Sequence, residues 1–102
     1  MVYEILPDGC LNGVGSDTHT NTKNKIFNEV ARKKKENNKK TIEGDYTTSY
    51  MNLQAVFITA DLKISPNKGQ YEFSWVEAGK EKYRGVGWKT RENQITVYYE
   101  YL

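Results

Sequence analysis

The chain has only one cysteine and one histidine among its 102 residues. A lone Cys10 excludes an internal disulfide and a CxxC metal pair, so we expect a reduced, structural thiol beside a turn rather than a nucleophile. His19 lies in a polar loop, and together with Asp17 and Asp45 it matches no familiar metal-ligand spacing. The sequence therefore predicts no metal and no cofactor, and a protein that is not an enzyme.

Long hydrophobic runs are also missing. No apolar stretch reaches the length that a membrane-spanning helix needs. The beginning, MVYEILPDGC, has no basic region and is interrupted early by Asp8 and Gly9, unlike a signal peptide. We therefore expect a soluble cytoplasmic protein without membrane contact, although a mature domain released from a leader would look the same.

Charge is unevenly distributed along the chain. The net charge is +2, yet eight Lys and Arg stand against two Glu between Lys23 and Lys40, a local balance of +6. A basic segment of this kind can mark a surface for an anionic partner, although a solvated face is the commoner explanation. The candidate basic patch consists of Arg32, Lys33, Lys34, Lys35, Lys39 and Lys40.

Aromatic residues are plentiful, at 13% of the chain with eight tyrosines. In QYEFSWVE they alternate with polar residues, as Tyr71, Phe73 and Trp75. Side chains in a strand point alternately to opposite faces, so this pattern predicts a sheet with an aromatic-lined face. Val56 to Ile64 alternates in the same way and predicts a strand with one buried face.

The order of these patterns predicts one mainly β domain over residues 1–102, with α+β character. Residues 1–15 should form a hairpin about Pro7-Asp8-Gly9, and residues 44–102 a five-stranded antiparallel meander with short linkers. The meander strands are expected near Gly44–Met51, Ala55–Ile64, Gln70–Glu77, Lys82–Lys89 and Gln94–Leu102. About seven strands would then form a barrel or a strongly curled sheet, because one short helix cannot cover so much sheet.

That helix is predicted over residues 23–37. Ile26, Phe27, Val30 and Ala31 have the spacing of one helical face, Thr22 or Asn21 could serve as the N-cap, and the second half is basic.

Two glycines in the later meander share one face of their strand, Gly85 and Gly87. No strand-to-helix phosphate turn accompanies them, so we do not expect nucleotide binding there. Their expected role is to make room for a large side chain such as Trp75, or to let the strand coil.

The meander resembles small lipocalin-like (calycin) β-barrel domains of uncharacterised bacterial proteins. The resemblance rests on Gly44-Asp45-Tyr46, on Tyr71 through Trp75, on Tyr83-x-Gly85-x-Gly87 and on Ile95-x-Val97-x-Tyr99. Lipocalins usually open with Gly-x-Trp, where this chain has Tyr46, and the predicted helix precedes the meander instead of following it. The resemblance implies an up-and-down barrel whose interior could hold a small apolar molecule.

The functional prediction is non-covalent binding of a small apolar or aromatic ligand, or of a protein partner, through an aromatic-lined face. The same aromatics could instead be ordinary core. Two further hypotheses remain open, namely a nucleic-acid-binding module that uses the basic segment, and an assembly domain that forms a homodimer through its sheet. The predicted ligand-binding residues are Tyr71, Phe73, Trp75, Tyr83, Trp88 and Tyr99.

Overall fold

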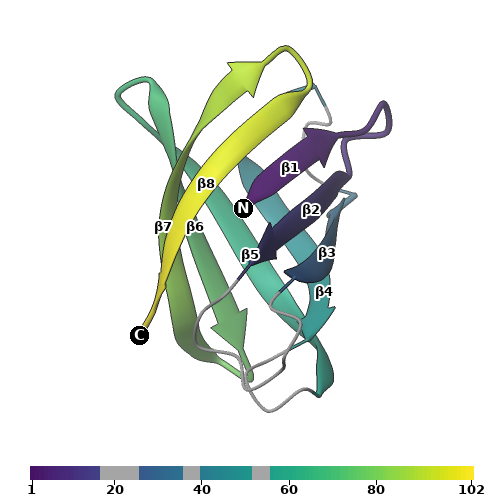
Figure 1. Cartoon of the computed structure of the whole chain (residues 1–102), viewed down its shortest axis with the longest axis vertical. Coiled ribbons are helices and arrows are strands. Elements are labelled where there is room, and N and C mark those ends of the chain that lie inside the picture. The colour runs from purple at the N-terminus through teal and green to yellow at the C-terminus, as the bar shows by residue number, and fades with distance from the viewer. Residues whose placement is uncertain (17–25, 36–39, 52–55) are drawn as a thin grey trace.

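The computed structural model describes residues 1–16, 26–35, 40–51 and 56–102. Eight strands follow one another around a closed antiparallel barrel, each hydrogen-bonded to the next along the chain (Figure 1). The strands are β1 (Val2–Ile5), β2 (Leu11–Ser16), β3 (Ile26–Lys33), β4 (Gly44–Met51), β5 (Phe57–Asn67), β6 (Gln70–Glu77), β7 (Lys80–Arg91) and β8 (Gln94–Tyr101). The mainly β, antiparallel prediction is confirmed.

Closure of the barrel joins the first strand to the last. Val2 faces Thr96 and Glu4 faces Gln94 in the register of β1 and β8. The Met1 amine extends this ladder by donating to the Val97 carbonyl at 2.8 Å, and the Val97 amide donates to the Met1 carbonyl at 2.7 Å. Closure removes the exposed edges that an open sheet would leave.

The helix predicted for residues 23–37 is wrong where the chain is described, because Ile26–Lys33 forms β3 between β2 and β4. Exposure along β3 alternates: Glu29, Ala31 and Lys33 are buried, whereas Val30 and Arg32 are exposed. Two of the three buried positions carry charge. A charged residue that faces the interior breaks the apolar–polar alternation by which a strand is recognised. The sequence of β3 therefore showed only the helix-like spacing of its apolar residues.

The meander is predicted more accurately. The expected bounds of β4 and β6 match the observed ones. Strand β7 extends beyond its expected range at both ends, and β5 begins later than expected, at Phe57, and ends later, at Asn67. Along β5, Ala60, Leu62 and Ile64 are buried and Phe57 is 68% exposed, as the alternation predicted. Pro66 was assigned to a linker but lies in β5 near its end.

The barrel interior is filled by side chains from all eight strands. Apolar residues dominate it, and several aromatic rings are fully buried among them, including Tyr3 and Phe73. Gly87 makes this packing possible, because a Cβ there would lie 2.9 Å from the Phe73 ring and 2.8 Å from Val97. The predicted spacing role of the glycine is confirmed, with Phe73 rather than Trp75 as the ring that needs the room.

Among the residues that the structure describes, no helix has the length and apolar content to cross a membrane.

Candidate functional site

Five of the six predicted ligand-binding residues face the barrel interior. Phe73, Trp75 and Tyr83 are buried, and Tyr71 and Tyr99 are half-buried against the same core. The exception is Trp88, which lies on the outer wall with 45% of its surface exposed.

Four of the inward-facing rings are in mutual contact. The Phe73 and Trp75 rings stack with their centroids 5.7 Å apart, and the Trp75 indole contacts Tyr83 at 6.3 Å and Tyr99 at 5.9 Å. Aromatic pairs in such arrangements contribute about 0.5–1.5 kcal/mol beyond the area they bury. The aromatic face is therefore a continuous column, and its deep part belongs to the hydrophobic core.

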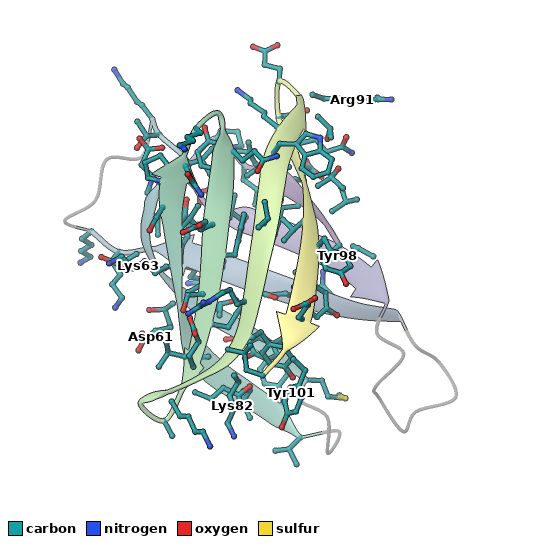
Figure 2. The ribbon with its side chains drawn as sticks, turned by 90° about the vertical axis from the view of Figure 1, so that its left-hand side faces the viewer. Asp61, Lys63, Lys82, Arg91, Tyr98 and Tyr101 are labelled. Atoms are coloured by element: carbon teal, nitrogen blue, oxygen red, sulfur yellow. The ribbon has the colours of Figure 1, made fainter. Side chains whose placement is uncertain are left out.

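At one end this column reaches solvent through four tyrosines, which we call the tyrosine cluster: Tyr50, Tyr83, Tyr99 and Tyr101. Tyr83 contacts the three others edge-on or steeply inclined, with centroids 5.5–6.0 Å apart. Exposure rises from 7% at Tyr83 to 46% at Tyr101. Figure 2 shows Tyr101 beside Lys82 at the lower end of the barrel, where β8 ends.

A carboxylate lies beside the tyrosine cluster. The Tyr50 hydroxyl donates to Glu77 Oε2 at 2.7 Å. Burial, followed by this hydrogen bond and the charge of Glu77, raises the pKa of Tyr50 well above its ordinary value. Tyr50 therefore stays protonated and acts as a donor, which leaves the cluster with hydroxyl groups, ring faces and one acidic neighbour.

Glu29 is the most unusual interior residue, and no pattern in the sequence singles it out. Its side chain is only 3% exposed. Its Oε2 atom accepts three hydrogen bonds: from the Tyr3 hydroxyl at 2.8 Å, from Thr48 Oγ1 at 2.6 Å and from Trp75 Nε1 at 2.9 Å. These three donors come from β1, β4 and β6, so Glu29 ties together strands that are not neighbours in the barrel.

Burial shifts the titration of Glu29 towards its neutral form, relative to a carboxyl group in water. Burial raises the pKa of the carboxyl, and the three hydrogen bonds only partly counteract this effect. Within the described ranges, no Lys or Arg forms an ion pair with it. Glu29 can hold a proton inside the barrel, but its burial keeps it away from any molecule in solution.

Close approach of Tyr3 to Glu29 depends on Gly13, which separates the two in the register of β1, β2 and β3. A Cβ at Gly13 would lie 2.7 Å from the Tyr3 ring. The missing side chain therefore lets the ring cross β2 and reach the carboxylate.

Among the described residues, the predicted basic patch is divided between exposed and buried side chains. Arg32, Lys35 and Lys40 are exposed, but Lys33 is buried, donates from Nζ to the Thr41 carbonyl and lies 5.5 Å from the centroid of the Tyr46 ring. Burial lowers the pKa of Lys33. Lys34 is paired with Asp61 at 3.4 Å. Lys39 lies outside the described residues, as do Asp17 and His19.

No family model, no curated protein and no solved structure matches this chain significantly. The eight-stranded antiparallel barrel is consistent with a calycin-like architecture. Membership of that family is not confirmed, and a barrel architecture by itself does not identify a function.

Proposed function

We propose that the protein binds a small apolar or aromatic molecule, without covalent chemistry, at the tyrosine cluster. The observation that supports this proposal is the unbroken passage from the buried Trp75 indole, through Tyr83 and Tyr99, to the 46% exposed Tyr101. A ligand placed there would extend the aromatic column of the core outward.

The chemistry of the tyrosine cluster suits such a ligand. Tyrosine offers a large apolar ring together with a hydroxyl that can orient a bound molecule. Stacking on rings that are already packed costs little side-chain entropy, because Tyr83 and Tyr50 are held by their neighbours. Glu77, which accepts a hydrogen bond from Tyr50, also gives the site one acceptor for a polar group on the ligand.

Trp75 provides a direct reporter of binding. In a Trp88→Phe background it is the only tryptophan, and it lies 5.9 Å from Tyr99. We would titrate this variant with p-cresol and follow tryptophan fluorescence. We expect a saturable change whose midpoint rises at least about tenfold in Tyr101→Ala, since one exposed ring of the site is removed.

Tyr98→Ala is the matched control, because Tyr98 also lies on β8 but is 69% exposed on the outer wall (Figure 2). Its p-cresol midpoint should equal that of the parent. The proposed function is contradicted if tryptophan fluorescence shows no saturable change with p-cresol, or if the Tyr101 and Tyr98 variants have equal midpoints.

The second candidate is assembly through the outer wall. One row of register partners crosses β7, β8, β1 and β2, and it consists of Trp88, Thr96, Val2 and Val14. The three apolar members of this row, Trp88, Val2 and Val14, are exposed. Exposed apolar residues gathered in this way are typical of contact surfaces. Light scattering should then give a dimer mass for the native chain and a monomer mass for Trp88→Ser; a monomer mass for the native chain removes this candidate.

A further inference from the structure

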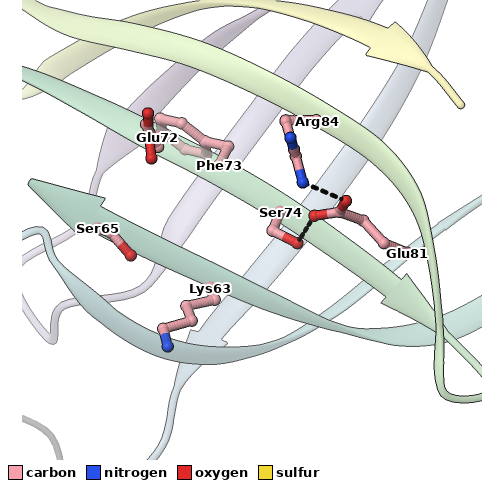
Figure 3. Close-up of a pocket in the computed structure, with 7 residues that line it drawn as sticks. All are labelled: Lys63, Ser65, Glu72, Phe73, Ser74, Glu81 and Arg84. Atoms are coloured by element: carbon pink, nitrogen blue, oxygen red, sulfur yellow. Dashed lines mark hydrogen bonds and ion pairs between the residues drawn. The ribbon is translucent and has the colours of Figure 1, made fainter. Parts of the chain in front are cut away.

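The outer wall carries a cavity of about 270 Å³ over β5, β6 and β7, and none of the tyrosine cluster lines it (Figure 3). Six of the seven residues that line it are polar or charged. The lining residues are Lys63, Ser65, Glu72, Phe73, Ser74, Glu81 and Arg84.

The strand register assembles this cavity from residues that are distant in the sequence. Lys63 faces Ser74 between β5 and β6, and Ser74 faces Arg84 between β6 and β7. A serine hydroxyl therefore lies between two cationic side chains in one row. In the next row Ser65 faces Glu72, which places a carboxylate beside the cationic row.

The cationic row keeps donors that no group of the described residues occupies. Arg84 donates from one nitrogen to Glu81 at 2.8 Å, but a guanidinium has five N–H donors. Ser74 donates to the same carboxylate, and this hydrogen bond, followed by Arg84, holds the pKa of Glu81 below its ordinary value. Lys63 has Asp45 opposite it on β4 but, among the described residues, forms no ion pair.

The opposite side of the cavity carries acceptors. Glu72 Oε1 accepts a hydrogen bond from Asn67 Nδ2 at 2.9 Å, and its carboxylate retains further lone pairs. Lys63 and Arg84 balance Glu72 and Glu81, so the cavity has no net charge but is polarised from the Lys63–Arg84 row to Glu72. A simple anion is repelled by Glu72 and Glu81 and a simple cation by Lys63 and Arg84, whereas a molecule with both charges can place each of them beside a group of the opposite sign.

We propose that this cavity binds a small zwitterion of the α-amino acid class, with its carboxylate between Lys63 and Arg84 and its ammonium at Glu72. Ser74 lies in the Lys63–Arg84 row and Ser65 faces Glu72, so each end of the cavity also carries a hydroxyl group (Figure 3). This site is distinct from the tyrosine cluster, because outward-facing residues form it with the single exception of the buried Phe73. Binding should be weak and salt-dependent, since its charged groups are near solvent.

The probe for this proposal is L-alanine, followed by amide chemical shifts in a ¹⁵N-labelled sample of the whole chain. We expect saturable shifts that map to β5, β6 and β7. Propionate lacks the ammonium and ethylamine lacks the carboxylate, so each should bind at least about tenfold more weakly than alanine. Equal shifts with alanine and propionate would reassign the cavity to simple anions and overturn the proposal, as would the absence of saturable shifts with alanine.

Two variants identify the binding groups. Lys63→Gln and Glu72→Gln each remove one charge from an exposed side chain, so both should fold and should weaken alanine binding by about tenfold. Lys89→Gln is the control, because Lys89 lies on β7 outside the cavity. The proposal fails if the Lys63 and Glu72 variants bind alanine as tightly as the Lys89 variant does.

Discussion

The two halves of the barrel fill its interior with different chemistry. From β5 to β8, the buried residues are aliphatic or aromatic. By contrast, β3 and β4 also bury Glu29, Lys33 and Thr48. The comparison shows how the polar half is accommodated: its Glu29 carboxylate accepts a hydrogen bond from Trp75 of the apolar half, and from Tyr3 and Thr48. Buried polar groups are tolerated when they are satisfied in this way.

The largest expected effect lies in the apolar half. Phe73 is fully buried and stacks against Tyr3 and Trp75, with centroid separations of 5.9 and 5.7 Å. Phe73→Ala should lower the free energy of unfolding by about 3–5 kcal/mol, because it removes apolar contacts and leaves a cavity. Urea unfolding measures this loss. Val86→Ala, on the outer wall of β7, is the control and should change stability by less than about 1 kcal/mol.

Dependence on pH separates the polar half from the apolar half. The pKa of Glu29 is raised by burial in the folded chain, so the native state binds its proton more tightly than the unfolded state does. The stabilisation is fully present below the ordinary pKa of about 4.5 and is lost as pH rises through the raised pKa of the folded protein.

Glu29→Gln removes this titration while keeping an oxygen that can accept hydrogen bonds. Thermal unfolding of the native chain, measured at increasing pH, should show a decrease in stability above pH 4.5 that the variant lacks. Parallel profiles for the two proteins would mean that Glu29 stays charged inside the barrel with no cost.

The smallest expected effect lies on the outer wall that both halves share. Lys34 and Asp61 form an ion pair at 3.4 Å between side chains that are 36% and 67% exposed. Solvent screens such pairs, so Lys34→Met should change the free energy of unfolding by less than about 1 kcal/mol. Urea unfolding at low and high salt would test this, and a loss of more than about 2 kcal/mol would contradict it.

Prediction from sequence succeeded where the alternation was apolar against polar. In β6, inward Phe73 and Trp75 separate outward or half-buried polar residues, and the expected bounds were correct. Prediction failed in β3, because Glu29 and Lys33 face the interior and interrupt the apolar side of the alternation. The remaining apolar residues then had the spacing of a helix. Of the tyrosine cluster, Tyr83 and Tyr99 were predicted, whereas Tyr50 and Tyr101 were not. Trp88 was grouped with the inward-facing rings although it lies five residues after Tyr83 in the same strand, and alternation places the two on opposite faces.

The sequence by itself determined that the chain is a mainly β, antiparallel protein with an aromatic interior, because period-two alternation and short turns are local properties. Only the tertiary structure decided that the sheet closes, that Glu29 is buried, and that Lys63, Ser74 and Arg84 line one cavity. These features depend on the register between strands. Register joins residues far apart in the chain, and no local pattern records it.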